Sequence, residues 1–175
     1  MNLESKRVYL RPLRESDAEG NYPHWLNDKE VCQYNSHGEI LYTSDQAKEY
    51  IKHVNNDLTY QVFAIIDKAT KKHIGNISLQ KIDMKNKNAE FAILLGEKEF
   101  WHKGYAYEAS TLILKHGFTT LTLHRIYCGT SILNKPMQNL ALKLGFIQEG
   151  VLQEAILKNQ IFFDVIIYGI INENS

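Results

Sequence analysis

Hydrophobic positions follow two different spacings along this chain. Segments in which apolar residues alternate with polar ones, or run together, are typical of strands, whereas apolar residues three or four positions apart are typical of helices. The segments with the strand pattern are 7–11, 60–66, 74–82, 89–95, 124–130, 146–157 and 160–171. The polar turns within 60–95 are short, so the three strands there are expected to form an antiparallel meander.

Helix-start signals introduce the remaining segments. Ser16–Glu19 and Thr43–Gln46 match the capping box, which satisfies unpaired N–H groups of a first helical turn. Asn134 is a favourable N-cap, and Gly145 can end the helix that follows it. Trp25, in the first helix, is expected in the core. The helical predictions are 16–26, a short piece around 30–34, 43–54, 104–121 and 134–145, with a loop over 35–38. This element order predicts an α+β fold.

The composition is that of an ordinary globular protein, with 44% hydrophobic and 23% charged residues, and we expect residues 1–175 to form a single domain. The 20 Lys and Arg balance the 20 Asp and Glu, so no strongly basic nucleic-acid surface is predicted. No apolar run is long enough to span a membrane or to follow Met1 as a signal peptide, which favours a cytoplasmic protein. Cys32 and Cys128 match no metal or redox spacing, so reduced thiols and no metal site are expected.

The most informative segment is the turn Trp101-His102-Lys103-Gly104-Tyr105-Ala106, between a predicted strand and a predicted helix. A helix N-terminus has unpaired N–H groups and a partial positive charge, which together favour an anion. Gly104 and Ala106 are small enough for a phosphate to approach, and Lys103 adds a cation. A glycine used for turn geometry alone is the alternative. Neither a Walker sequence nor a complete G-x-G-x-x-G is present, which disfavours a mononucleotide or dinucleotide fold.

Residues 101–109 resemble the acetyl-CoA pyrophosphate loop of the GNAT N-acetyltransferase superfamily, written Q/R-x-x-G-x-G/A. The chain as a whole is similar to the ribosomal-protein-acetyltransferase-like (Rim-type) subgroup. The other matching pieces, in order, are 8–13, 89–91, Asn134, 143–146, 149–150, Asp164 and 168–169. The resemblance implies an acetyl-CoA-dependent N-acetyltransferase with a mixed, mostly antiparallel sheet of about seven strands, flanked by about four helices and splayed at the acetyl-CoA site.

The resemblance also assigns residues to the co-substrate acetyl-CoA. Backbone N–H groups from His102 through Ala106 would hold the pyrophosphate, whereas Trp101 stands where the family has Gln or Arg. The strand 93–95 would hydrogen-bond the pantetheine arm, and Asn134 would contact the arm as well as cap its helix. The cofactor-binding residues are then Ile93, Leu94, Leu95, Trp101, His102, Lys103, Gly104, Tyr105, Ala106 and Asn134.

The implied reaction is direct transfer of acetyl from the thioester to a primary amine. A backbone N–H near Leu94 would polarise the thioester carbonyl. Glu90 is the candidate base, acting through water, and a carboxylate that anchors the strand or the substrate is the alternative. Ala141 falls where the family's usual Tyr acid is found, which keeps open a catalytically weak acyl-CoA sensor. Cys128 is favoured as a packed residue over a covalent nucleophile.

The acceptor site is expected between the N-terminal helices, the 35–41 loop and the final hairpin. Tyr34, His37, Glu39 and Glu90 are the candidate substrate-binding residues. A protein N-terminal amine, a nucleotide-linked amino sugar and a small polyamine or antibiotic-like amine compete as acceptors. The polyamine is disfavoured because the sequence shows no obvious acidic cluster. Neither nucleic acid nor a membrane is expected as a partner, and the resemblance raises a homodimer because relatives are often dimers.

Overall fold

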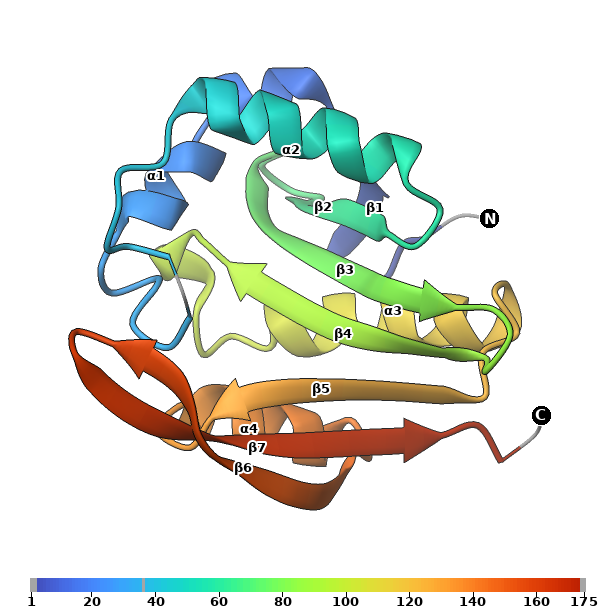
Figure 1. Ribbon diagram of the computed structural model, residues 1–175. Coiled ribbons are helices and arrows are strands. Elements are labelled where there is room, and N and C mark those ends of the chain that lie inside the picture. Colours follow the sequence, from blue (N-terminus) through green and yellow to red (C-terminus); the bar gives the residue numbers. More distant parts are fainter. Residues whose placement is uncertain (1–2, 36, 174–175) are drawn as a thin grey trace.

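The computed structural model describes residues 3–35 and 37–173, and a seven-stranded sheet runs through its centre (Figure 1). The strands are β1 (Val8–Pro12), β2 (Gln61–Asp67), β3 (His73–Asp83), β4 (Asn88–Leu95), β5 (Arg125–Ser131), β6 (Ile147–Lys158) and β7 (Ile161–Ile171). Their order in the sheet is β1-β2-β3-β4-β5-β7-β6. Neighbours are antiparallel except β4 and β5, which run parallel, so the predicted meander is confirmed as β2, β3 and β4.

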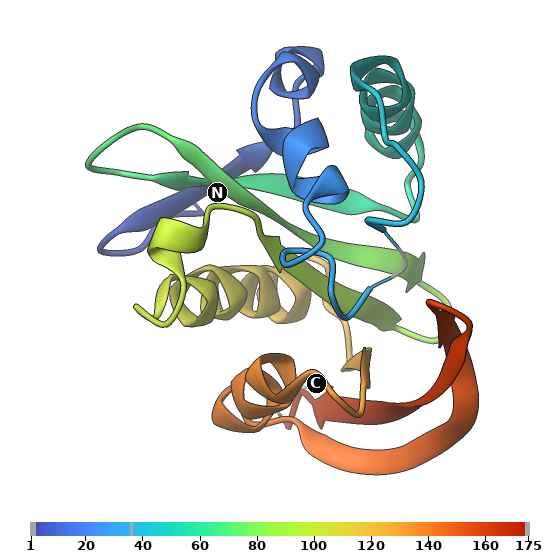
Figure 2. The same cartoon turned by 90° about the vertical axis from the view of Figure 1, so that its left-hand side faces the viewer.

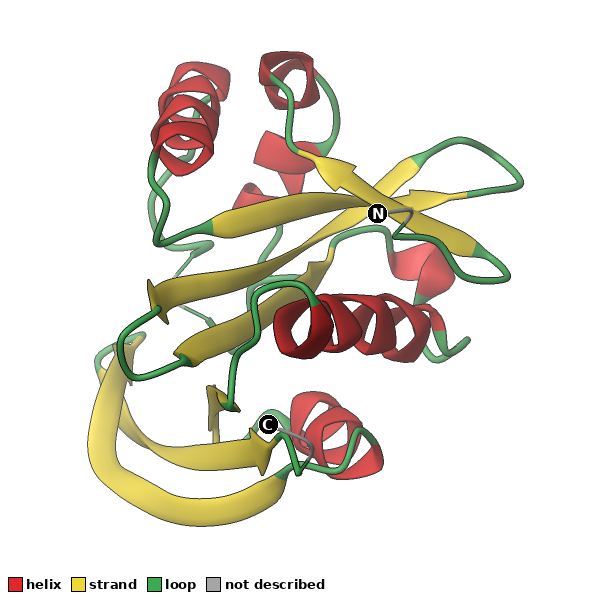
Figure 3. Cartoon of the chain, turned by 90° about the vertical axis from the view of Figure 1, so that its right-hand side faces the viewer, coloured by secondary structure: helices red, strands yellow, loops and turns green. Residues whose placement is uncertain are grey.

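In the part of the chain that the structure describes, four α-helices cover the two faces of this sheet. They are α1 (Tyr22–Asn27), α2 (Ser44–Asn56), α3 (Tyr105–Thr119) and α4 (Lys135–Lys143), and two 3-10 turns are η1 (Glu15–Glu19) and η2 (Lys98–Phe100). Figures 2 and 3 show α1 and α2 on one face and α3 and α4 on the other. The α+β fold expected from the resemblance is confirmed. None of the described helices is both long and apolar enough to cross a bilayer.

The first predicted helix, over residues 16–26, is divided in the structure into η1 and α1. Pro23 lies in the first turn of α1, where its fixed φ is favourable. A continuous helix would place Pro23 in the interior, where its missing N–H would cost a hydrogen bond. Trp25, on α1, is buried with 4% of its surface exposed, which confirms its predicted place in the core.

The short helical piece predicted around 30–34 is wrong, because this segment is a series of turns. Asp28 explains the difference: its Oδ1 accepts the N–H groups of Glu30 and Val31 at 2.9 and 3.2 Å. A side chain that bonds the backbone two and three residues ahead stabilises a turn in place of a helix. In the loop predicted after it, Ser36 lies outside the described residues.

The other helix signals are confirmed atom by atom. Thr43 Oγ1 accepts the N–H of Gln46 at 3.2 Å, and Gln46 Oε1 accepts the N–H of Thr43 at 2.9 Å, which is the capping box of α2. Asn134 Oδ1 accepts the N–H of Met137 at 3.2 Å and so caps α4. Gly145 follows α4 with φ of 92°, a left-handed conformation that suits glycine at a helix end.

Two hydrophobic cores form, one on each face of the sheet. The core beneath α3 and α4 contains Phe91, Ile113 and Cys128, and the core beneath α1 and α2 contains Trp25 and Ile51. Cys128 is 1% exposed, as predicted for a cysteine packed within its strand. Burial raises the pKa of the Cys128 thiol to about 12. A thiol that stays protonated at neutral pH is a poor nucleophile, so the structural interpretation of Cys128 is supported.

The parallel strands β4 and β5 separate along their length. Among the described residues, three consecutive pairs join them, from Asn88–Arg125 to Glu90–Tyr127. Beyond that point β4 pairs with β3 alone and β5 with β7 alone, and the two strands diverge in Figure 1. The splay that the resemblance implies is therefore present. It leaves the two facing strand edges without hydrogen bonds to each other.

Candidate active site

The 101–106 turn forms a concave backbone surface at the start of α3. Gly104 is the N-cap of α3 with φ of 83°, and His102 has φ of 58°. Left-handed residues alternating with ordinary ones turn successive N–H groups toward a common point, an arrangement called a nest that binds anions. Within the described chain, no N–H from His102 to Tyr107 donates to a backbone carbonyl. These groups, with the dipole of the 15-residue α3, make the turn a candidate anion site.

Gly104 is the position in this turn where a side chain fits least. Its left-handed φ is one that L side chains rarely adopt. A Cβ at this position would lie 3.2 Å from Nη2 of Arg7, which is tighter than an ordinary contact. Glycine therefore permits both the shape of the turn and the close approach of the Arg7 side chain.

Trp101 anchors the turn to the end of β4. Its indole Nε1 donates to the carbonyl of Leu95, the last residue of β4, over 2.7 Å. The indole has one donor, and this bond uses it. The Trp101 side chain therefore links the turn to β4 at the position where the resembling family has Gln or Arg. A cofactor contact at Trp101 remains a prediction for its backbone alone.

The backbone of β4 presents alternate residues to the edge facing β5. The N–H of Gly96 donates to the carbonyl of Ile74 on β3 at 3.0 Å, and antiparallel neighbours alternate between hydrogen-bonded and non-hydrogen-bonded pairs. Two residues before Gly96, Leu94 therefore also directs its N–H toward β3. Ile93 and Leu95, at the alternate positions, direct theirs toward β5. The N–H expected near Leu94 is therefore that of Ile93 or Leu95, because Leu94 directs its own N–H into the sheet.

Glu90 lies in the last residue pair that joins β4 to β5, opposite Tyr127. Its Oε2 is 2.7 Å from Nζ of Lys81 on β3, and this hydrogen bond raises the pKa of Lys81. After burial, the charge of Glu90 is the second cause of the raised pKa of Cys128. Glu90 is thus placed where the strands part, as a base near the thioester requires, and it is also held in an ion pair, as an anchoring carboxylate requires.

The other predicted substrate residues lie where the segment after α1 meets the β6–β7 hairpin. Nζ of Lys158 donates to three main-chain carbonyls of that segment, including that of His37 at 2.8 Å. The N–H of Asn159 donates to Oε1 of Glu39 at 2.9 Å. Burial, and then the Lys158 charge, lower the pKa of His37. The predicted junction of loop and final hairpin is therefore present, with His37 and Glu39 in it.

Tyr34 lines a cavity of about 90 Å³ at this junction. Ser131, the last residue of β5, and Phe163 of β7 line it as well. The cavity therefore lies at the β5 end of the divergence. Lys158 and Asn159, which contact His37 and Glu39, also line it, so the structure brings Tyr34, His37 and Glu39 to one junction, whereas Glu90 lines no part of this cavity.

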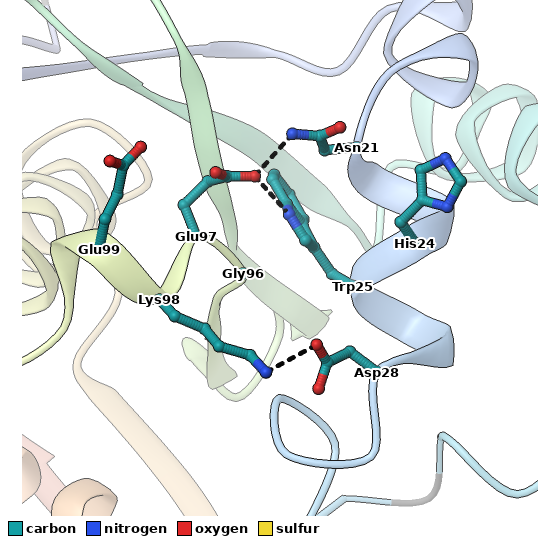
Figure 4. Close-up of a pocket in the computed structure, with 8 residues that line it drawn as sticks. All are labelled: Asn21, His24, Trp25, Asp28, Gly96, Glu97, Lys98 and Glu99. Carbon is teal, nitrogen blue, oxygen red and sulfur yellow. Dashed lines mark hydrogen bonds and ion pairs between the residues drawn. The ribbon is translucent and has the colours of Figure 1, made fainter.

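A second cavity, of about 410 Å³, lies between α1 and the end of β4 (Figure 4). The carboxylates of Asp28, Glu97 and Glu99 line it. Lys98 Nζ is 2.8 Å from Asp28 Oδ2, and Trp25 Nε1 donates to Glu97 Oε1 at 2.9 Å. The sequence shows no obvious acidic cluster, and these carboxylates come together only through the packing of α1 on β4. Each is also paired with a lysine, Asp28 with Lys98 and both Glu97 and Glu99 with Lys72.

Asn134 and Ala141 belong to the start and the end of α4. The cap uses Oδ1 of Asn134 and leaves its amide nitrogen for other contacts, so the predicted cofactor role and the cap are compatible. Ala141 is completely buried in the core beneath α4. It supplies no acid group for the leaving thiolate.

Comparison with known proteins identifies the family. The family model described as acetyltransferase (GNAT) domain matches residues 7–147, which is most of the chain. The chain belongs to the GNAT acetyltransferase family. Uncharacterized N-acetyltransferase p20 of Bacillus licheniformis is 32% identical over 175 residues, covering 98% of this chain and 96% of the relative. Spermidine N(1)-acetyltransferase of Escherichia coli K12 is 31% identical, over 82% of this chain and 74% of the relative. This GNAT protein is accordingly an N-acetyltransferase.

Solved structures agree with this family. A probable acetyltransferase superposes with a TM-score of 0.88 at 21% identity, over 98% of this chain and 96% of that one, and supports the fold. Spermidine N-acetyltransferase from Vibrio cholerae in complex with CoA and spermine gives 0.85 at 27% identity, over 94% and 95% of the two chains. Acetyl-CoA is the co-substrate of the GNAT family. The residues of this chain fit it, because a nest with a left-handed glycine at the N-cap of α3 suits phosphates and the unpaired β4 edge suits an amide-containing arm.

Proposed function

We propose that this GNAT enzyme transfers acetyl from acetyl-CoA directly to a primary amine. One observation carries the proposal: β4 and β5 part beyond Glu90, and the nest of the 101–106 turn lies just past the far end of β4. This arrangement supports a long co-substrate whose phosphates lie at the turn and whose arm follows β4. Bound acetyl-CoA supplies an activated acetyl group. The chain must hold it, orient it and take a proton from the amine.

Two residues are assigned the chemical roles. Ile93 directs its N–H to the edge that faces β5, and we assign it to the thioester carbonyl, where a fixed donor stabilises developing negative charge. Glu90 is assigned to accept the proton of the acceptor amine through a water molecule. Because Ala141 offers no acid, another tyrosine or solvent protonates the leaving thiolate.

Three classes of acceptor are considered. A protein N-terminal amine and a nucleotide-linked amino sugar are the two that the sequence favours, with Tyr34, His37 and Glu39 as candidate contacts. A polyamine gains support from relatives that are named spermidine N-acetyltransferases. The carboxylates beside α1 add to it only where a polycation replaces the lysines that pair with them, Lys98 at Asp28 and Lys72 at Glu97 and Glu99.

Thiol release from acetyl-CoA tests the proposal. The protein is incubated with spermidine, with a peptide that has a free N-terminus, and with a nucleotide-linked amino sugar. Each acceptor has its N-acetylated form as a matched control. Release that depends on one free amine and stops with its blocked form is expected. CoA binding without release for every amine would instead establish a catalytically weak acyl-CoA sensor.

Further proposals concern the setting of the enzyme. Alignment with 98% of this chain and 96% of p20 supports one acetyltransferase domain over residues 1–175. The Rim-type subgroup, a cytoplasmic location and a homodimer rest on the sequence and its resemblance. Size-exclusion chromatography with light scattering tests the homodimer, because a monomer mass at micromolar concentration contradicts it.

A further inference from the structure

Arg7 reaches the 101–106 turn from a distant part of the chain. It directly precedes β1, and its side chain lies against the start of α3. Nη1 donates to the carbonyl of Lys103 at 2.8 Å, and Nε donates to Oε1 of Glu108 at 2.9 Å. The guanidinium carbon is 4.5 Å from the ring centroid of Tyr105, a cation–π distance. One side chain therefore contacts the turn and the first turn of α3 together.

Glu108 holds Arg7 in this position. Its Oε2 accepts the Arg7 backbone N–H at 3.1 Å and the Ser5 hydroxyl at 2.8 Å. Burial raises the pKa of Glu108, but the hydrogen bonds from Ser5 and Arg7 outweigh burial and leave the pKa below its ordinary value. Glu108 is therefore ionised at neutral pH and fixes both the backbone and the side chain of Arg7.

The bond from Arg7 determines which way one peptide group faces. The carbonyl of Lys103 and the N–H of Gly104 belong to the same planar trans peptide and point in opposite directions. Arg7 draws the carbonyl to its own side, so the N–H of Gly104 faces the other way. If this peptide rotated, a carbonyl oxygen would replace an N–H among the donors of the nest and would repel an anion.

We propose that Arg7 is a positioning residue for the co-substrate, which holds the Lys103–Gly104 peptide in the orientation that binds phosphate. The inference rests on the proposed role of the 101–106 turn. The sequence carries no signal for it, because Arg7 precedes Lys103 by 96 positions and belongs to a different predicted element.

Titration with CoA tests the proposal on the purified protein. Arg7→Gln is expected to weaken CoA binding by about tenfold, which is the scale of one charge-assisted hydrogen bond. Lys6→Gln is the matched control, because Lys6 is exposed and its loss removes the same charge one residue away. Arg7→Lys keeps the charge but lacks the planar fork, so it is expected to recover only part of the affinity.

A second measurement separates positioning from folding. Hydrogen exchange of residues 102–106 is compared at saturating CoA, where every variant is fully bound. Wild type is expected to gain protection there, and Arg7→Gln to gain less. CoA affinity and protection equal to wild type in Arg7→Gln, or full affinity in Arg7→Lys, would overturn the proposal.

Gly104→Val keeps this outcome distinct from failure of the site itself. If Gly104→Val also binds CoA as wild type does, the 101–106 turn is not the CoA site and the proposed function loses its main support. If Gly104→Val loses CoA and Arg7→Gln does not, the role of Arg7 alone is overturned. Should Arg7→Gln fail to fold, Glu108→Gln releases the same guanidinium and takes its place in the titration.

Discussion

At the scale of single residues, Glu90 has two roles that the geometry allows together. It stands in the last pair that joins β4 to β5, and it is 2.7 Å from the ammonium of Lys81. An ion pair in which Lys81 is well exposed contributes little to stability, because solvent screens it. The two roles are therefore separable by substitution.

Glu90→Gln is expected to lower turnover by about 100-fold or more if Glu90 is the base, since positioned bases contribute rate factors of that size. The affinity for CoA should change little, because Glu90 lies away from the 101–106 turn. Steady-state kinetics with the best acceptor from the amine panel gives turnover, and titration gives CoA affinity.

Lys81→Gln is the matched control for this substitution. It removes the ion pair but keeps the Glu90 carboxylate, so turnover should remain within a few-fold of wild type. Equal loss of turnover in Glu90→Gln and Lys81→Gln, or a less stable Glu90→Gln whose folded fraction keeps the wild-type turnover, would show that Glu90 anchors the strand and is not the base.

The residues that sequence reasoning could and could not find differ in a physical way. Gly104 was predictable because a small residue at the start of a helix indicates, from the local sequence alone, a turn that a phosphate can approach. The indole bond of Trp101 to Leu95 and the reach of Arg7 to Lys103 were not, because each depends on a contact between separate elements. The β4 N–H groups that face β5 lie on either side of Leu94, at Ile93 and Leu95, and the sequence does not show which alternate residues bond to β3.

At the scale of elements, α3 carries a buried histidine, His116. His116 Nε2 is 2.6 Å from Oε1 of Gln61 on β2, and its ring packs edge-on to Phe63 with centroids 5.9 Å apart. The Nδ1 atom of His116 is buried and has no hydrogen-bond partner among the described residues. Burial is the main cause that lowers the pKa of His116 from 6.5. The folded protein therefore favours the neutral ring.

This shift predicts lower stability in acid. As pH falls below about 6.5, the unfolded chain takes up a proton that the folded His116 resists, so the free energy of unfolding falls. One histidine contributes at most about 1.4 kcal/mol per pH unit. Urea unfolding of wild type and His116→Gln between pH 7.5 and pH 5 should show a smaller decrease in the variant, by up to about 2 kcal/mol, because roughly 1.5 pH units lie below 6.5. Identical pH dependence in the two proteins would contradict a depressed pKa at His116.

Element positions followed from local pattern wherever no tertiary contact interfered. The capping box at Thr43, the cap at Asn134 and the alternation in β2 to β4 all gave the right elements. The failures have specific causes: Pro23 separates η1 from α1, and Asp28 bonds the backbone of the segment predicted as a short helix. Both effects depend on one side chain, and a periodicity averaged over a window does not register them.

At the scale of the whole molecule, the site is produced by topology. The parallel β4–β5 pair lies where the antiparallel meander meets the C-terminal strands, and that pair is joined for three residue pairs before it parts. The resemblance implied this divergence, and the hydrophobic pattern alone did not. The grouping of carboxylates and lysines beside α1 is hidden from the sequence for a related reason, because Asp28 and Glu97 line one cavity only after the sheet and helices assemble.

Titration of CoA into wild type, Gly104→Ala and Gly104→Val tests whether the 101–106 turn is the CoA site. Wild type should bind, and CoA at 100 times its dissociation constant should raise the free energy of unfolding by about 2.7 kcal/mol. Gly104→Ala should bind more weakly, and Gly104→Val should not bind although it still unfolds cooperatively, since a branched residue disfavours the left-handed φ of the turn and its side chain displaces Arg7. Binding of CoA to Gly104→Val with the wild-type affinity would show that the 101–106 turn is not the CoA site.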